Sequence, residues 1–278
     1  MRLVQLNVHP LKSGAIRPVQ SVSVLPSGLE DDRSWMLVDA DARMVSAREI
    51  HELFSIVADT PMTDAALDRD LRLRAPGHRD LTLDHPDGAR EAVRLFSLDL
   101  QAVPAGREAD DWLRAVLGRD LRLVWCDDPT RRSLQPGLAE PGDHAAFPDA
   151  FPVTLASMAS LGQLNDWIAE LALERGEEVA APLPMSRFRP NIVVDGDVPF
   201  AEDGWAEVRI GDVVLRTAQP VGRCVMTTID PHTLKTAKEP IRTLARHRRS
   251  PEGDTLFAVH LVPVSSGRIH VGDEVTVS

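Results

Sequence analysis

The chain has little cysteine and no long hydrophobic run, and each of these absences excludes a class of protein. Its 278 residues include two cysteines, Cys126 and Cys224, which are too few for a disulfide framework and stay thiols in a reducing compartment. No apolar run approaches the length of a membrane span, so we expect no membrane partner. Residues 1–7 alternate like a strand and lack the apolar region of a signal peptide, which predicts a cytoplasmic location.

Positive charge is scarce relative to negative charge. The chain has 31 Lys and Arg residues against 42 Asp and Glu, which gives a formal net charge of -11. Because nucleic-acid binding depends on clustered Lys and Arg, no nucleic-acid partner is expected. The basic cluster at residues 242–249 is short, and we interpret it as the solvated face of a helix. The length and ordinary composition predict one large or two moderate soluble domains.

The first part of the chain is dense in short strand candidates, each bounded by Gly, Pro or Asp clusters. They cover residues 3–8, 19–25, 34–38, 54–59, 71–74, 80–83 and 91–96. This density predicts an antiparallel barrel or sandwich. Short helices are predicted at residues 47–53 and 111–117, the second with Asp110 as its N-cap and Gly118 as its stop. Cys126 continues an alternating strand at residues 121–126 and is interpreted as structural.

A segment without periodicity, residues 127–152, connects the two halves or forms a mobile loop over a site. Residues 152–156 predict a strand that leads to Ser157, which begins the most helical stretch of the chain, ending near Gly176. A hydroxyl there is an ordinary cap, although the free N–H groups and the dipole of the helix also suit a phosphate. Further strands are predicted at residues 191–194, 205–210, 213–218, 223–229 and 255–264, with a terminal hairpin at 268–275. The fold class is therefore mainly β of the α+β type with a few helices, and both halves are expected to contribute to one site.

The chain is organised around two segments, residues 188–194 (FRPNIVV) and residues 222–231 (GRCVMTTIDP). Cys224 follows a Pro-Val-Gly turn, stands beside Arg223, whose charge can stabilise a thiolate, and opens a β-branched run that predicts a strand. A thiolate held in this way is a nucleophile or a metal ligand. The alternative is a small buried hydrophobic residue at the start of a strand.

These two segments resemble the MOSC domain, the C-terminal module of molybdenum-cofactor sulfurases. Residues 9–13 (HPLKS) and 32–38 (DRSWMLV) resemble the β-barrel domain that precedes MOSC in the amidoxime-reducing family. The resemblance extends over nearly the whole chain and rests on several motifs in the right order. It implies an N-terminal MOSC β-barrel domain at residues 1–120 and an antiparallel β-barrel MOSC domain at residues 127–278.

The resemblance implies a molybdenum-molybdopterin cofactor with Cys224 as the metal ligand. The implied cofactor-binding residues are Lys12, Ser13, Arg33, Ser157, Arg189, Asn191, Gly222 and Arg223. A thiolate suits a soft metal centre, cations and hydroxyls suit the terminal phosphate, and Asn191 with the backbone at 222–223 suits the flat heterocycle. Asp230, a carboxylate near Cys224 in sequence, either orients a water or substrate as a catalytic group or starts a turn before Pro231.

The sequence departs from the family pattern at three positions. His9 and Gly222 replace a tyrosine and a serine of the eukaryotic motifs, and His260 replaces a tyrosine that lines the eukaryotic site. His260 is therefore a candidate for the cofactor pocket, with a structural role as the alternative, and substrate preference stays open. The chain ends at Ser278 without the ferredoxin domain of some bacterial relatives, so a separate reductase or ferredoxin-type protein is the expected electron donor.

The leading hypothesis is a molybdenum-dependent oxidoreductase that reduces small N-hydroxylated compounds such as amidoximes, hydroxylamines or N-hydroxylated bases. One alternative is a sulfur carrier or sulfurtransferase that holds a persulfide on Cys224, and another is a non-catalytic molybdopterin carrier. Pyridoxal phosphate is a further alternative cofactor, because Lys12 is a conceivable aldimine former. A Schiff-base lysine is normally desolvated, however, and Lys12 beside Ser13 and Gly14 is more typical of a phosphate contact.

Overall fold

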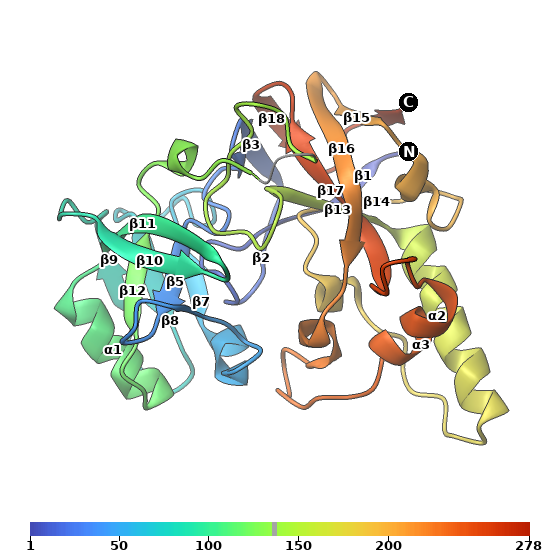
Figure 1. Ribbon diagram of the computed structural model, residues 1–278, viewed down its shortest axis with the longest axis horizontal. Coiled ribbons are helices and arrows are strands. Elements are labelled where there is room, and N and C mark those ends of the chain that lie inside the picture. Colours follow the sequence, from blue (N-terminus) through green and yellow to red (C-terminus); the bar gives the residue numbers. More distant parts are fainter. Residues whose placement is uncertain (135–137) are drawn as a thin grey trace. The chain divides into compact units, whose positions relative to one another are not determined.

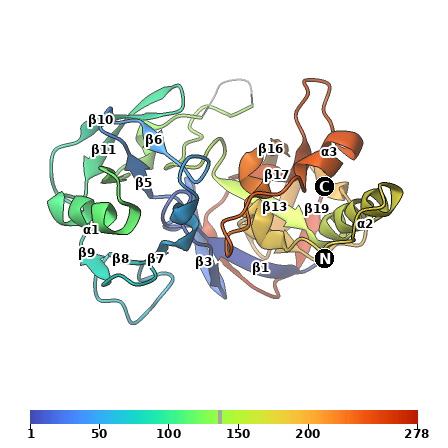
Figure 2. The same ribbon diagram turned by 90° about the horizontal axis from the view of Figure 1, so that it is seen from below.

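The computed structural model describes residues 1–134 and 138–278 (Figures 1 and 2). Strands make up 35% and helices 20% of the structure, in curled antiparallel sheets, so the predicted mainly-β class with a few helices is confirmed. The chain forms two compact units: unit 1 comprises residues 1–7, 20–25 and 153–278, and unit 2 comprises residues 8–19 and 26–152. The division at 1–120 and 127–278 stays a prediction, and part of the predicted loop 127–152, residues 135–137, lies outside the described residues.

Unit 1 contains a long sheet with the strand order β19-β15-β16-β17-β13-β14-β1. Among these seven strands as the structure describes them, β13 and β14 form the one parallel pair, and the other neighbours are antiparallel. Strand β3 lies outside this sheet and pairs with β18. The strands are β1 (Leu3–Val8), β3 (Ser21–Leu25), β13 (Val153–Ser157), β14 (Ile192–Val194), β15 (Glu207–Ile210), β16 (Val213–Gly222), β17 (Leu256–Pro263), β18 (Gly267–His270) and β19 (Val275–Val277). The helices are α2 (Met158–Glu174), α3 (Ile241–His247) and the 3-10 helices η3 (Met185–Phe188), η4 (Ala201–Gly204) and η5 (Val225–Thr228).

Helix α2 forms where the sequence predicts it, because a cap and an apolar face coincide. The Ser157 hydroxyl accepts the backbone N–H of Ser160 at 3.1 Å, which satisfies a donor of the first turn. Leu161 and Leu164 are buried in the core of this unit, together with the stacked rings of Phe188 and Phe257, whose centroids lie 3.9 Å apart. Helix α3 lies beside α2 in both views (Figures 1 and 2). The organising motif at 188–194 is therefore anchored in the core by its phenylalanine.

Two predictions for unit 1 are wrong. The predicted strand at 223–229 does not form, because β16 ends at Gly222 and η5 follows. The hydroxyls of Thr227 and Thr228 each donate a hydrogen bond to the backbone carbonyl three residues earlier. Thr227 donates to Cys224 at 3.0 Å and Thr228 to Val225 at 2.6 Å. These local bonds compete with strand pairing. The predicted hairpin at 268–275 is also absent, because β18 pairs with β3 and β19 with β15.

Unit 2 contains a sheet with the order β10-β11-β12-β5-β6 and a smaller sheet with the order β7-β8-β9. Its elements are β2 (Arg17–Val19), β4 (Gly28–Leu29), β5 (Trp35–Val38), β6 (Met44–Val45), β7 (Val57–Asp59), β8 (Leu71–Arg74), β9 (Leu81–Leu83), β10 (Glu91–Leu95), β11 (Leu98–Pro104), β12 (Arg122–Trp125), α1 (Arg107–Leu117) and the 3-10 helices η1 (His51–Ser55) and η2 (Pro129–Arg131). The larger sheet buries a core that includes Met36, Val93, Val124 and Phe147.

The helix boundaries in unit 2 differ from the prediction at their starts. Helix α1 begins at Arg107 after Gly106, so Asp110 lies inside the helix and is not its N-cap, whereas Gly118 ends it with a φ of 65° as predicted. The helix predicted at 47–53 is reduced to η1, which starts at His51. Among the residues that the structure describes, no helix is both long and apolar enough to cross a membrane.

Candidate functional site

The predicted site residues fall into two sets, one in each unit. Unit 2 carries Lys12, Ser13 and Arg33, and unit 1 carries Ser157, Arg189, Asn191, Gly222, Arg223, Cys224, Asp230 and His260. Within unit 2, the segment that carries Lys12 and Ser13 is hydrogen-bonded to the segment that carries Arg33. The backbone N–H of Lys12 donates to the Trp35 carbonyl at 2.8 Å. Each set is described below by itself.

Lys12 is the most buried cation of the unit 2 set. Its side chain is only 3% exposed, and its ammonium donates to the backbone carbonyl of Phe147 at 2.8 Å and to the carboxylate of Asp149. Burial lowers the pKa of Lys12 to about 8, although Asp149 opposes the shift. Lys12 is therefore desolvated, which removes the argument that the sequence raised against an aldimine at this residue.

Three charged residues that the sequence did not single out surround Lys12. Asp149 also accepts Arg48 Nη2 at 2.7 Å, and although burial alone raises the pKa of Asp149, Lys12 and Arg48 hold it well below its usual range. Arg132 is buried and donates from Nη1 to the backbone carbonyls of Ala146 and Pro148, each at 2.7 Å. No spacing rule could have found these contacts, because Asp149 and Lys12 are 137 positions apart in sequence.

Arg33 belongs to a second buried charge group in unit 2. Its guanidinium pairs with the carboxylate of Asp32, which also accepts the backbone N–H of His9 at 2.8 Å and faces His9 Nδ1 at 3.0 Å. Burial alone raises the pKa of Asp32, but Arg33 and His9 together hold it at about 2. His9, one of the departures from the family pattern, thus helps to fix the carboxylate that positions Arg33.

Three of the predicted site residues have an unusual backbone conformation. Ser13, Arg33 and Arg189 adopt left-handed φ values of 65°, 51° and 51°. Residues other than glycine rarely adopt this region, and such strain gathers at functional sites where the surrounding structure enforces it. Asp31, Ala42, Phe96, Phe200, Leu234 and Ala258 adopt the same region, and Arg189 does so as the C-cap of η3, so the conformation alone does not separate a binding role from a structural one.

Cys224 lies at the start of η5 with its side chain exposed. The preceding Arg223 bonds the core backbone: Nε donates to the Phe257 carbonyl at 2.8 Å and Nη1 to the Phe188 carbonyl at 3.1 Å. Its guanidinium carbon also lies 5.7 Å from the centre of the Phe188 ring. Arg223 therefore ties the cysteine segment to the motif at 188–194 within unit 1.

Asn191 is fully buried and joins three strands of the unit 1 sheet. Its Oδ1 accepts the backbone N–H of Thr154 at 3.1 Å, and its Nδ2 donates to the backbone carbonyl of Asn7 at 3.2 Å. The backbone of Asn191 repeats both links, donating to the Thr154 carbonyl at 2.9 Å and accepting from the Asn7 N–H at 2.8 Å. This residue has a structural role as a clamp between β1, β13 and β14.

Ser157 is buried at the start of α2 beside a carboxylate that the sequence did not single out. Glu202 accepts the Ser160 hydroxyl at 2.7 Å and the Ser157 hydroxyl at 3.3 Å. Glu202 is fully buried, and this burial raises its pKa. The N-terminus of α2 therefore already faces a carboxylate from the protein itself, so the phosphate contact at Ser157 stays a prediction.

The remaining predicted residues of unit 1 lie on strands or turns. Asp230 Oδ1 accepts the backbone N–H groups of His232 at 2.9 Å and Thr233 at 2.8 Å, and these bonds lower its pKa. The carboxylate thus forms the turn that the sequence offered as its alternative role. Gly222 ends β16, and His260 lies on the central strand β17, between Gln219 of β16 and Thr154 of β13.

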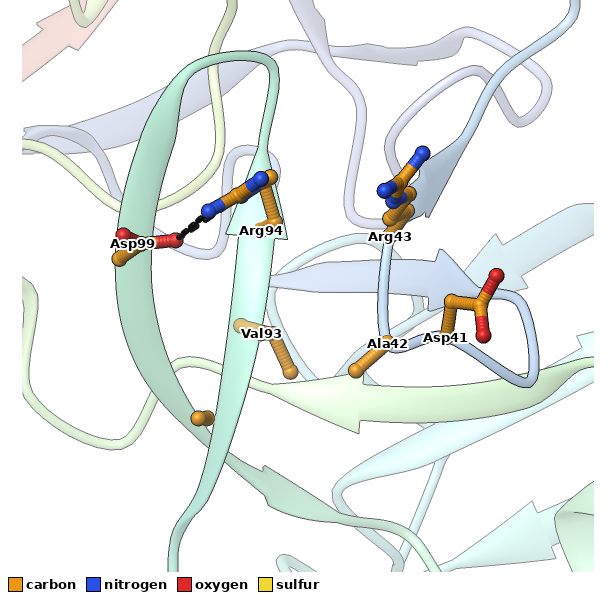
Figure 3. A pocket seen from close by; sticks show the side chains of 7 residues that line it. Asp41, Ala42, Arg43, Val93, Arg94 and Asp99 are labelled. Carbon is orange, nitrogen blue, oxygen red and sulfur yellow. Dashed lines mark hydrogen bonds and ion pairs between the residues drawn. The ribbon is translucent and has the colours of Figure 1, made fainter.

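A pocket of about 410 Å³ opens elsewhere in unit 2, on the edge of the larger sheet (Figure 3). It is lined by Asp41, Ala42, Arg43, Ala92, Val93, Arg94 and Asp99. Figure 3 shows Arg94 turned toward Asp99, with which it forms an ion pair of 2.9 Å. The pocket contains none of the predicted site residues, and its charges are mixed.

The two sets fit different parts of the implied cofactor. Around Lys12, the cations Lys12, Arg33, Arg48 and Arg132 outnumber the carboxylates Asp32 and Asp149, which suits a phosphate dianion. In unit 1, the exposed Cys224 can offer a soft sulfur ligand. Among the described residues, no group of three or more His, Cys, Asp or Glu side chains is arranged to hold a metal ion.

Comparisons with known proteins match almost the whole chain. Residues 1–120 match the family described as the MOSC N-terminal beta barrel domain, and residues 142–276 match the MOSC domain. The mitochondrial amidoxime-reducing component 1 of Danio rerio is 32% identical, over 98% of this chain and 83% of the relative. The component 1 of Homo sapiens is 31% identical, over 98% of this chain and 82% of the relative. The component 2 of Bos taurus is 31% identical, over 98% of this chain and 81% of the relative.

These comparisons overturn one prediction. The absence of a signal peptide predicted a cytoplasmic location, but the relatives that match the chain from end to end are named mitochondrial proteins. The pattern at residues 1–7 reports only that this segment forms a strand, which the structure shows as β1. A strand at the start of the sequence carries no information about the compartment.

Proposed function

The chain belongs to the family that joins a MOSC N-terminal beta barrel domain to a MOSC domain, and from this premise we propose that it is a molybdenum-cofactor-dependent oxidoreductase that reduces N-hydroxylated compounds. The relatives that match 98% of the chain are named amidoxime-reducing components, which supports amidoximes as the first substrate class. Hydroxylamines and N-hydroxylated bases share the same N–O bond. The observation that carries the proposal over its alternatives is this match of 98% of the chain to relatives named amidoxime-reducing components. The exposed thiol of Cys224, in the segment that Arg223 ties to the buried motif at 188–194, is the proposed position of the metal.

The proposed cofactor is molybdenum bound to molybdopterin, and Cys224 is the proposed protein ligand of the metal. When bound, this group supplies the two-electron chemistry that removes oxygen from nitrogen as water, with two protons. The chain's own residues hold and orient the group. Lys12, Ser13 and Arg33 are proposed to bind its phosphate, because they combine a buried ammonium, a hydroxyl and a guanidinium.

The proposed contacts in unit 1 are Ser157, Arg189, Asn191, Gly222, Arg223 and His260, with Asp230 as a group that orients substrate or water. Arg189 ends η3 in a left-handed conformation with a φ of 51° and directly precedes the buried Pro190 and Asn191. Ser157, Asn191 and Asp230 already bond protein groups. A cofactor contact by any of these three side chains requires that its present hydrogen bonds to the protein be shared with the cofactor.

Electrons are proposed to come from a separate electron-transfer protein, a reductase or a ferredoxin-type protein. The test is an assay of the full chain, expressed in a host that makes the molybdenum cofactor, with benzamidoxime as a simple amidoxime and reduced methyl viologen as an artificial donor. Stoichiometric formation of benzamidine by the wild type, and its loss in protein grown with tungstate in place of molybdate, is the expected result. Molybdenum-loaded protein that forms no amidine contradicts the proposed substrate class.

A persulfide carrier is the second candidate function, and the exposure of the Cys224 thiol favours it equally. Bound sulfane sulfur that is lost in Cys224→Ser, in protein without molybdenum, would favour this candidate over the reductase. A molybdopterin carrier differs from both, since its Cys224→Ser variant still delivers cofactor. Pyridoxal phosphate has only the desolvation of Lys12 in its favour, and an aldimine there requires that the ammonium lose its proton and leave Asp149.

A further inference from the structure

The carboxylate of Asp149 lies between two cations of unit 2. Its Oδ1 accepts the ammonium of Lys12, and its Oδ2 accepts Arg48 Nη2 at 2.7 Å. Both cations also pack against one aromatic ring, with Lys12 Nζ 5.6 Å and the Arg48 guanidinium carbon 5.3 Å from the centre of Phe96. An ammonium and a guanidinium that converge on one acid group are the donors with which proteins bind phosphate.

The three side chains differ in exposure in a way that lets the anion exchange. Lys12 is 3% exposed and Arg48 22%, whereas the Asp149 side chain is 48% exposed. Lys12 also keeps a bond to the Phe147 carbonyl at 2.8 Å that does not depend on Asp149. The carboxylate can therefore rotate into water while the ammonium stays in place.

The backbone around Asp149 is held by Arg132. This buried guanidinium donates from Nη1 to the carbonyls of Ala146 and Pro148, at 2.7 Å each, and from Nη2 to the carbonyl of Ala150 at 3.5 Å. Displacement of the Asp149 carboxylate thus requires a change of side-chain rotamer and no movement of the segment that carries it. Such a rotation is fast for a half-exposed side chain.

The charge around this pair favours an anion of higher charge than a carboxylate. Arg33 and Arg132 lie close enough to Lys12 to repel its ammonium. A phosphate monoester carries about two negative charges near neutral pH. It therefore compensates this cluster better than the single charge of Asp149 does.

We propose that Lys12 and Arg48 form a phosphate-binding pair, and that Asp149 is the internal anion that occupies this pair until a phosphate monoester displaces it. The inference rests on the proposed function for the identity of the ligand, which is the terminal phosphate of the pterin cofactor. Arg48 becomes a binding residue that no motif indicated. Asp149 keeps the buried ammonium paired before binding and selects against weakly charged anions.

The test is a titration of the full chain, purified from a host that does not make the molybdenum cofactor, with methyl phosphate. The chain has three lysines, Lys12, Lys235 and Lys238, so the NMR signals of isotope-labelled lysine side chains report on Lys12 directly. Asp149→Asn is expected to bind methyl phosphate about tenfold more tightly than the wild type, a factor that corresponds to about 1.4 kcal/mol. Addition of Arg48→Gln to this variant is expected to abolish the gain.

Asp99→Asn is the matched control, because it makes the same change in net charge and removes the carboxylate that pairs with Arg94 at 2.9 Å in the same unit. It is expected to bind as the wild type does. Equal affinity of the wild type and Asp149→Asn overturns the inference, as does a gain that survives Arg48→Gln. If Asp149→Asn does not fold, the wild type decides: a Lys12 signal that shifts to saturation supports the inference, and a Lys12 signal that methyl phosphate leaves unchanged overturns it.

The two proposals fail separately in these experiments, because the titration requires no molybdenum. A chain that binds methyl phosphate as expected but never takes up molybdenum contradicts the proposed function alone. A chain that takes up molybdenum, while its affinity for methyl phosphate is unaffected by Asp149→Asn, contradicts only the inference about Asp149 and Arg48.

Discussion

The hydroxyl of Ser160 donates to Glu202 Oε1 at 2.7 Å at the start of α2, where both residues are fully buried. This contact places the carboxyl group of Glu202, in η4, against the first turn of α2, the longest helix that the structure describes in unit 1. A carboxylate at a helix N-terminus is stabilised by the dipole and by donors of the first turn. Burial has the opposite effect, because it disfavours the charged carboxylate and raises its pKa. Burial therefore determines whether the stability rises or falls with pH.

The first prediction concerns Glu202→Gln. Burial raises the pKa of Glu202 above its ordinary value of 4.5, so between these two values the folded chain holds a proton that the unfolded chain has released. The free energy of unfolding therefore falls as the pH rises through this window, by about 1.4 kcal/mol for each pH unit that the window spans. Glu202→Gln is expected to remove this fall. Urea unfolding from pH 4.5 to 7 measures it, and an unchanged slope in the variant contradicts the account.

The second prediction concerns Asn191→Ala. Its side chain bonds the backbone of both Thr154 and Asn7, so truncation leaves a buried N–H and a buried carbonyl without these partners. We expect a loss of about 2–4 kcal/mol in the free energy of unfolding. Asn165→Ala is the control, because the half-buried Asn165 makes the same pair of bonds to the backbone of Leu183, at 3.1 and 2.8 Å. A loss for Asn191→Ala no larger than that for the control would argue against the clamp.

The third prediction concerns the pH dependence of Lys12→Met. Burial lowers the pKa of Lys12 from 10.5 to about 8, so between these values the unfolded chain holds a proton that the folded chain has released. The stability of the wild type relative to Lys12→Met therefore rises with pH across this window, by up to about 3 kcal/mol. Parallel urea titrations at several pH values measure the difference. A difference that stays constant or falls from pH 8 to 10.5 contradicts the burial of this ammonium.

Much of the fold follows from local patterns in the sequence. The bounds of β1 and β8 agree with the alternating runs at 3–8 and 71–74, and α2 begins at the predicted cap, Ser157. The run after Cys224 forms η5 instead of the predicted strand. Its β-branched residues favour a strand, but the hydroxyls of Thr227 and Thr228 donate hydrogen bonds to the local backbone. Strand propensity accounts for the preference of β-branched residues but not for hydrogen bonds from their hydroxyls to the nearby backbone.

The sequence could propose candidate site residues only where a motif contains them. Cys224, Arg223 and Lys12 stand in recognisable segments, so the sequence could select them. Asp149 could not be selected, because its contact with Lys12 spans 137 positions and depends on Arg132 holding the flanking backbone. Glu202 was missed for the same reason, since 42 positions separate it from Ser160. Long-range pairing of charges depends on the tertiary fold and leaves no periodic signal.

The central claim, that Cys224 is the metal ligand of a molybdenum cofactor, is tested most directly by the molybdenum and pterin content of purified protein. The comparison is between the wild type, Cys224→Ser and Cys126→Ser, all expressed in a host that makes the cofactor. Cys126 is the matched control, because burial raises the pKa of its thiol to about 12 and it packs against the core of unit 2. The account predicts near-stoichiometric molybdenum in the wild type and in Cys126→Ser, with a loss of molybdenum of about tenfold or more in Cys224→Ser, as expected when a metal ligand is removed. Equal molybdenum in all three proteins, or none in the wild type, would contradict it.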